Sequence, residues 1–166
     1  MSDNELRTSA IGLFNYAESY RRAALSLKAE ENMWTHPYAP IVYLFSHSIE
    51  LFLKSYLRKS HSLNELRSIG HNISNLYNTS KNIGLEKLPA TEHLINNFKL
   101  SYFLEVRYIK TSHKEAPSIE LLSYVSAEIC KAAHFSFLDE FKYLGHDLNI
   151  VNIFNSETFN VSLIHN

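Results

Sequence analysis

Cysteine, glycine and proline are all scarce in this chain of 166 residues. Cys130 is the only cysteine, which excludes an intrachain disulfide framework and is compatible with a reducing compartment. A cytoplasmic location is therefore expected. Only four glycines and four prolines occur, so turns are few and the elements between them are long, which favours helices.

An excess of charge of either sign is also missing. The formal net charge is -1, so any contact with nucleic acid must be local and not a broad basic surface. The apolar stretch from Ile41 to Leu57 is too short for a membrane span and carries histidine, glutamate and lysine near its middle. The N-terminus MSDNELRTSA has no basic segment followed by an apolar run, so no signal peptide is expected. These features predict a soluble protein that does not contact a membrane.

Apolar residues are plentiful in this chain. They make up 45% of it and aromatic residues 13%, against 20% charged residues, a composition typical of a compact globule. The length fits one domain with a sizeable core. Apolar residues recur mostly at helical spacing, so the expected fold is all-α. We predict a four- to five-helix bundle over residues 1–148 and a separate tail over residues 149–166.

Capping residues and chain breaks give the approximate helix boundaries. The predicted helices run from a cap at Asp3 to about Asn32, from Pro40 to Lys59, over a short stretch that starts near His71, from a cap at Thr91 to near Arg107, and from Pro117 and Ser118 to Gly145. The segment SHSLNELRSIG is predicted as a short helical turn or loop. In the tail, NSET lies between two short apolar runs, which predicts a β-hairpin that packs on the bundle or on a second subunit.

The stretch VYLFSHSIELFLKSYL, residues 42–57, combines core-building side chains with His47, Glu50 and Lys54. Together with Arg58, these residues recur at steps of three or four and share one face of a helix. If that face is solvated, Glu50 and Lys54 form an ordinary surface pair. If the apolar residues bury most of the helix, the charged stripe must pair internally or line a cleft or subunit interface, because unpaired burial is costly. Both interpretations stay open.

Two further segments accompany this helix: GHNISNLY and a Tyr-rich helix that ends in EVRY. The region from Pro37 to Tyr108 resembles the HEPN superfamily of small helical bundles, whose members often show a His-x-x-Glu-x-x-x-Lys helix and a Gly-His-Asn/Asp turn. The resemblance implies a bundle that dimerises and handles nucleotides or RNA. Many members are metal-independent ribonucleases of toxin or defence systems, and some related bundles pair with a nucleotidyltransferase.

The resemblance also implies catalytic roles for Arg107 and His113. Such nucleases carry an arginine followed, after four to six residues, by a histidine, and RYIKTSH fits with five residues between. The histidine would move a proton to or from a ribose hydroxyl while the arginine stabilises charge on the phosphate. Tyr108 departs from the pattern, because catalytic members usually place a small polar residue there. The alternative is that Arg107 is structural or binds a ligand and that His113 is an ordinary loop histidine.

Ligand binding is expected along the polar face of the second helix and in the basic loop after residue 107. The residues predicted to bind a ligand are His47, Glu50, Lys54, Arg58, His71, Tyr108 and Lys110. His71 either faces an anion at a helix start or belongs to a helix-entry device in which Asn72 or the histidine caps backbone amides.

No metal or other cofactor is expected. No two histidines lie three or four residues apart, and the sequence has neither a cysteine cluster nor a Gly-rich phosphate loop. Cys130 is expected to be a small core residue.

The combined prediction is a cytoplasmic, HEPN-like homodimer that binds RNA or a nucleotide near Lys54, Arg58, Arg107 and Lys110. Ribonuclease activity is a further hypothesis. The alternative function is a non-catalytic interaction module that serves dimerisation or docks to a partner enzyme such as a nucleotidyltransferase.

Overall fold

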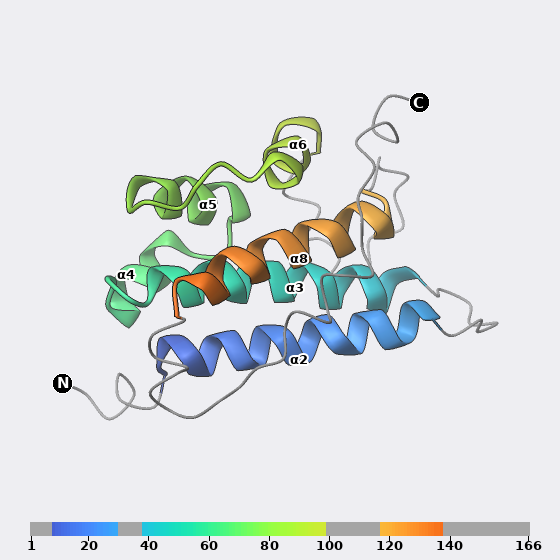
Figure 1. Ribbon diagram of the computed structural model, residues 1–166, viewed down its shortest axis with the longest axis horizontal. Coiled ribbons are helices and arrows are strands. Elements are labelled where there is room, and N and C mark those ends of the chain that lie inside the picture. The colour runs from blue at the N-terminus through green and yellow to red at the C-terminus, as the bar shows by residue number, and fades with distance from the viewer. Residues whose placement is uncertain (1–7, 30–37, 99–116, 138–166) are drawn as a thin grey trace.

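The computed structural model describes residues 8–29, 38–98 and 117–137. Within these ranges it contains six α-helices and no strand, which confirms the predicted all-α fold (Figure 1). The helices are α2 (Ala10–Ala29), α3 (Tyr38–Leu57), α4 (Leu63–Ile69), α5 (Ile73–Asn82), α6 (Pro89–Asn97) and α8 (Ile119–Phe135). The predicted hairpin and four predicted site residues, Arg107, Tyr108, Lys110 and His113, lie outside the described residues.

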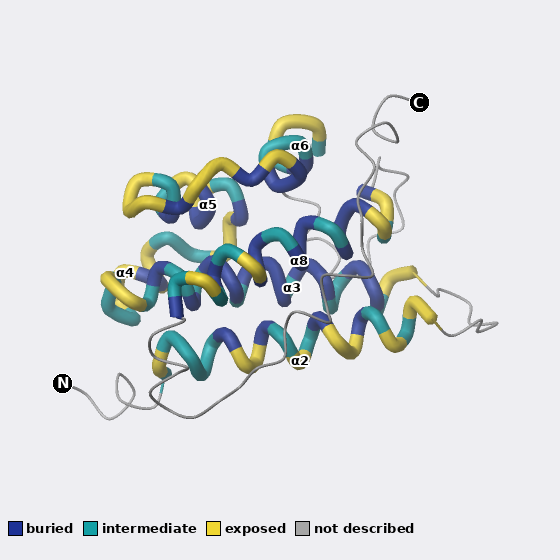
Figure 2. Tube along the Cα trace, viewed as in Figure 1, coloured by how far each residue is buried: buried dark blue, intermediate teal, exposed yellow. Residues whose placement is uncertain are grey.

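Helix α3 occupies the centre of the bundle. It packs against α2, α8 and α5, while α6 packs on α8 (Figure 1). Figure 2 shows that buried residues run along most of α3, whereas α2 alternates between buried and exposed positions. The largest buried apolar side chains on α3 include Phe45, Ile49, Phe52 and Leu53. This burial shelters Glu50 from open solvent, while Tyr43, His47 and Lys54 on the same helix stay partly exposed.

Helices α2 and α3 lie side by side in opposite directions. At one end, the Nε of Arg58, just after α3, donates to the backbone oxygen of Thr8, just before α2, at 3.0 Å. Farther along the pair, the rings of Tyr20 and His47 lie 4.6 Å apart. These two contacts set the register between the helices.

Local capping explains where several helices start. The side chain of Ser118 accepts from the backbone of Leu121 at the start of α8, where the sequence predicted the helix to open. Asn72 accepts from the backbone of Asn75 at the start of α5, which is one of the two capping alternatives named for the Gly-His-Asn turn. The segment predicted as a short helical turn or loop contains the seven-residue helix α4. It begins with a capping box at Ser62, a signal that the apolar spacing of so short a segment did not reveal.

Helix α6 begins at Pro89, so the prediction that Thr91 caps it is wrong. Leu88 stands at the cap position and contributes no side-chain hydrogen bond. The cap comes from α8 instead. The Glu128 carboxylate accepts from the backbone N–H groups of Ala90 and Thr91 at 3.3 and 3.0 Å and from the Thr91 hydroxyl at 2.8 Å.

Helices α6 and α8 both end earlier than predicted. α6 stops at Asn97, whose side chain donates to the backbone oxygen of His93, and Phe98 adopts an extended backbone. α8 stops at Phe135, followed by a tight turn in which Ser136 donates to backbone oxygens of the last helical turn. This turn allows the Phe137 ring to pack 5.9 Å from that of Phe14 in the core.

Candidate functional site

Glu50 is the centre of a sheltered polar cluster. Its side chain is only 4% exposed, and its Oε1 accepts hydrogen bonds from the Nζ of Lys54 at 2.9 Å and from the Nδ1 of His71 at 2.8 Å. Lys54 is itself 14% exposed, whereas His71 is 55% exposed. Of the two interpretations of the stripe, the structure therefore shows the buried and internally paired one for Glu50 and Lys54.

Two segments bring this cluster together. Glu50 and Lys54 lie one turn apart on α3, while His71 comes from the turn that joins α4 to α5. Gly70 in that turn has φ 79° and ψ -137°, a backbone conformation that is essentially reserved for glycine. Asn72 then caps α5. Gly70 and Asn72 thus fix the direction in which His71 reaches α3.

The charge state of Glu50 follows from competing influences on its pKa. Burial is the largest and raises the pKa, but hydrogen bonds and positive charge from Lys54 and His71 together outweigh it, so the pKa lies below its ordinary value. The carboxylate is therefore ionised at neutral pH and can only accept hydrogen bonds. It follows that Nδ1 of His71 carries the proton shared with Glu50. The opposite nitrogen, Nε2, then accepts in the neutral ring and donates in the cationic ring.

A pocket of about 220 Å³ lies beside this cluster. Its basic side chains are Lys54, Arg67 and His71, and the guanidinium of Arg67 also donates to the side chain of Asn64 at 3.2 Å. The remaining lining consists of Thr8, Leu13, Leu63, Leu66 and Gly70. Two permanent positive charges therefore stand against the one negative charge of Glu50. Most of the lining is apolar and Lys54 is already paired with Glu50, so the pocket can hold an anionic group only at its basic side, through charge-assisted hydrogen bonds.

The other predicted ligand-binding residues in the described part of the chain have structural contacts. Arg58 donates to the backbone oxygens of Thr8 and His61, both at 3.0 Å, and so ties the end of α3 to the start of α2. His47 packs edge-on against Tyr20, and its ring is stacked on Tyr43 at 5.9 Å with an interplanar angle of 11°. Neither side chain lines the 220 Å³ pocket.

Arg67 is a pocket residue that the sequence did not identify as a ligand group. Arg67 lies four residues before His71, too close to fit the arginine–histidine spacing that the HEPN resemblance implies. The apolar lining of the pocket could not be predicted either. Leu13 belongs to α2, and only the packing of α2 on α3 brings it to the pocket that Lys54 lines. Neither position carries a local sequence signal.

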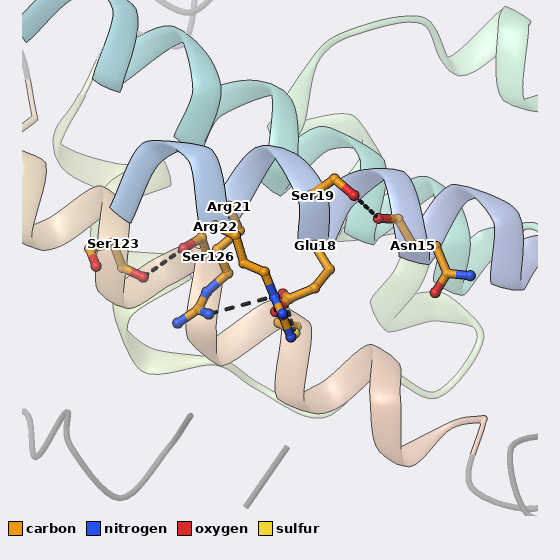
Figure 3. A network of polar contacts seen from close by, with 8 residues as sticks. Asn15, Glu18, Ser19, Arg21, Arg22, Ser123 and Ser126 are labelled. Carbon is orange, nitrogen blue, oxygen red and sulfur yellow. Dashed lines mark hydrogen bonds and ion pairs between the residues drawn. The ribbon is translucent and has the colours of Figure 1, made fainter. Parts of the chain in front are cut away.

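A second polar cluster joins α2 to α8 and contains Cys130. Glu18 accepts from Arg22 at 2.9 Å, and the buried Arg21 lies 4.0 Å from the same carboxylate (Figure 3). The Cys130 thiol faces Glu18 at 3.7 Å. Burial, reinforced by the negative charge of Glu18, raises the pKa of this thiol far above its usual range. Cys130 is therefore a protonated core residue, as predicted, and is unsuited to nucleophilic chemistry.

A larger groove of about 400 Å³ lies on the other side of the bundle, between α8 and the segment before α6. The exposed ring of Phe135 forms part of its lining, together with Glu86, Leu88, Tyr124, Ala127, Glu128, Lys131 and Ala132. Glu128 is occupied by its contacts with α6, so Glu86 and Lys131 supply the other charges of the groove.

Two features are missing from the part of the chain that the structure describes. No three or more histidine, cysteine, aspartate and glutamate side chains gather there in a way that would hold a metal ion. None of the helices of residues 8–29, 38–98 and 117–137 has the length and apolar character needed to cross a membrane.

Comparison of the chain with protein-family models, with curated proteins and with solved structures finds no match. The resemblance to the HEPN superfamily therefore stays a prediction from the sequence.

Proposed function

We propose that the protein is an HEPN-like domain that binds RNA or a nucleotide by placing a phosphate group in the 220 Å³ pocket. The observation that carries this proposal is the meeting of Lys54, Arg67 and His71 around one pocket. Lysine acts on phosphate as a point charge, and arginine can bind two of its oxygens at once. His71 adds a hydrogen-bond donor when it is protonated and an acceptor when it is neutral.

The buried carboxylate supports the proposal through orientation. Glu50 holds the ammonium of Lys54 and the ring of His71 on one oxygen atom, so both groups are already positioned at the pocket. Preorganised groups lose less conformational entropy when a ligand binds. The contact also joins the two segments on which the HEPN resemblance rests, because Glu50 belongs to HSIELFLKSYL and His71 to GHNISNLY.

Binding to fluorescently labelled RNA and to adenosine 5'-monophosphate tests this proposal. We expect Arg67→Gln to weaken affinity about tenfold and to lower the slope of log affinity against log salt by roughly one, because one phosphate contact is lost. Lys87→Gln is the matched control, since Lys87 is exposed and does not line the pocket. Lys54→Met adds a second variant that keeps the length of the side chain.

The outcome separates the pocket from general electrostatics. An unchanged affinity in both Arg67→Gln and Lys54→Met would refute the proposal. An equal loss in Lys87→Gln would also refute it, because the binding would then depend on net charge and not on this pocket.

Metal-independent RNA cleavage is the finer hypothesis, and it rests on Arg107 and His113. Cleavage of mixed RNA in EDTA that is lost in both Arg107→Ala and His113→Ala supports it, whereas equal cleavage by the variants removes it. His71→Asn belongs in the same assay. The pairing of its ring with a carboxylate makes His71 a second acid–base candidate that the arginine–histidine spacing does not identify.

A non-catalytic interaction module is the second candidate function. The exposed Phe135 ring in the 400 Å³ groove favours it, because apolar side chains gathered at a groove often mark protein contacts. This candidate predicts a homodimer, or a complex with a partner enzyme such as a nucleotidyltransferase, that Phe135→Ser dissociates. Sedimentation velocity of the wild type and of Phe135→Ser measures the homodimer directly. If both assemble equally, the groove is not the contact surface.

A further inference from the structure

Aromatic side chains follow the interface between α2 and α3 away from the 220 Å³ pocket. On α3, Tyr43, His47 and Lys54 are separated by four and seven residues and therefore share one face. On α2, Leu13, Tyr16 and Tyr20 follow a matching path. Leu13 and Lys54 line the same pocket, and the Tyr20 ring contacts that of His47 farther along. Because the helices are antiparallel, Tyr16 lies between these two points.

The rings of this aromatic surface are held in fixed orientations. Tyr20 packs edge-on against His47 at an interplanar angle of 80°, and Tyr43 lies nearly parallel to His47 at 11°. All three side chains are partly exposed, and Tyr16 is 67% exposed. Rigid aromatic rings beside a cationic pocket provide a platform on which unpaired bases stack.

The spacing of the two parts limits the length of the ligand. Lys54 and His47 are seven residues apart, which corresponds to about 10 Å along the helix axis. A stacked strand rises about 3.4 Å per nucleotide, so this separation spans about three nucleotides. A mononucleotide can occupy the pocket but cannot also reach the far rings.

We infer that the ligand is single-stranded RNA of at least about three nucleotides, with one phosphate in the pocket and neighbouring bases stacked on Tyr16 and on the cluster of Tyr20, His47 and Tyr43. This inference rests on the proposed function and names its substrate class. A duplex does not fit, because its bases are stacked on one another and their faces are not available to tyrosine. The net charge of -1 agrees with a short local contact in place of a long phosphate track.

Affinity is measured for adenosine 5'-monophosphate and for RNA oligonucleotides of three and six nucleotides. We expect the hexamer to bind at least about tenfold more tightly than the mononucleotide, because stacking adds to phosphate binding. Tyr16→Leu should weaken the affinity for the hexamer roughly tenfold and leave the affinity for the mononucleotide unchanged. Tyr43→Leu should act in the same direction.

Tyr38→Leu is the matched control. Tyr38 is as exposed as Tyr16, at 67%, but lies nine residues before His47 on α3, which places it on the opposite face of the helix. Tyr38→Leu should therefore leave hexamer affinity unchanged. An equal loss in Tyr38→Leu, or an affinity that does not increase with length, would overturn the inference.

The same measurements show whether base stacking on the aromatic surface or phosphate binding in the pocket is wrong. If Arg67→Gln weakens mononucleotide binding but length and Tyr16→Leu have no effect, the pocket stands and the aromatic surface does not bind bases. If Arg67→Gln has no effect on any ligand, the proposed function itself fails. Equal binding of an RNA duplex of the same sequence would overturn the assignment to an unpaired strand.

Discussion

Glu50 is a carboxylate almost wholly removed from water that accepts hydrogen bonds from two basic side chains. Burial of a charge is tolerated only where partners replace the lost hydration. Lys54 and His71 supply that replacement here. The same three side chains thus serve the stability of the fold and the proposed pocket, and pH affects both.

Stability should fall in acid because of Glu50. Its pKa in the folded protein lies below the ordinary value of 4.5, so the unfolded chain binds the proton more readily. The stabilisation is fully present above pH 4.5 and is lost as the pH falls through the lower folded pKa. Urea unfolding between pH 7 and pH 3 measures it, and Glu50→Gln should show a smaller loss than the wild type.

Glu86→Gln is the control for this titration. Glu86 is exposed on the segment before α6. Its variant should follow the wild-type curve. A Glu50→Gln curve parallel to that of the wild type would show that the buried carboxylate does not govern acid unfolding.

The sequence predicted the polar residues of α3 better than their surroundings. Steps of three and four placed Glu50 and Lys54 on one face, and the apolar neighbours gave a physical reason for burial. The partner His71 lies 21 residues from Glu50 along the chain, so its hydrogen bond depends on how α4 turns back onto α3. No local sequence pattern indicates that Glu50 and His71 lie close together in space.

At the scale of elements, the turn between α4 and α5 depends on one glycine. Gly70 has φ 79° and ψ -137°, and a Cβ added there would meet no atom within 4 Å. Gly70→Ala should therefore destabilise the protein by about 1–3 kcal/mol through backbone strain alone. Chemical denaturation measures the loss. Gly12→Ala is the comparison: its φ is not positive, and the added Cβ would lie 3.1 Å from the Ser9 hydroxyl, a side chain that can shift, so it should cost less.

Helix α6 depends on a cap supplied by another helix. Glu128→Ala removes the acceptor for two backbone N–H groups and for the Thr91 hydroxyl. We expect a loss of about 2–3 kcal/mol in the free energy of unfolding, because hydrogen bonds to a charged group are among the stronger ones. Hydrogen exchange should locate the effect in the first turn of α6.

Glu120→Ala is the control on the same helix. Glu120 is largely exposed, and its ion pair with Lys28 is 3.9 Å long. Such surface pairs contribute little to stability, so the variant should unfold almost as the wild type does. A Glu128→Ala protein as stable as Glu120→Ala would contradict the capping role.

Helix boundaries were predictable where the capping residue lies next to the helix it caps. The helix start predicted at Ser118 is such a case, and Asn72 proves to be the capping residue of the two alternatives offered by the Gly-His-Asn turn. Thr91 was wrong because the cap of α6 is Glu128, 37 residues away in the chain. The early end of α8 depends on the packing of Phe137 against Phe14, which periodicity along one helix cannot show.

At the scale of the molecule, Cys130 reports on opening of the bundle. It is the only cysteine, it is buried, and burial raises its pKa, so little thiolate exists in the folded protein. Labelling by a thiol reagent should therefore be slow in native buffer. With added urea, its rate should follow the fraction of molecules that are open.

A double variant, Cys130→Ser with Ser19→Cys, provides the control for labelling. Ser19 is exposed on α2, so a thiol at this position should react at once in native buffer. Equally fast labelling of Cys130 in the wild type would show that α8 separates from α2 without global unfolding.

The all-α class followed from composition and periodicity, because few glycines and prolines leave long segments that apolar spacing identifies as helices. The apolar residues of α3 left two interpretations open, and its central place became evident only from its packing against α2, α5 and α8. How α4 and α5 lie on it could not be predicted either, because short helices carry little periodicity and dock through contacts distant in sequence.

The placement of α3 affects how such a protein can diversify. A helix enclosed by α2, α5 and α8 tolerates few substitutions, so Glu50 and Lys54 are costly to exchange. Arg67, in contrast, is exposed on the short peripheral helix α4 and still reaches the pocket. Evolution, or a laboratory library, would therefore find new ligand preferences most readily by varying α4 while leaving the central helix intact.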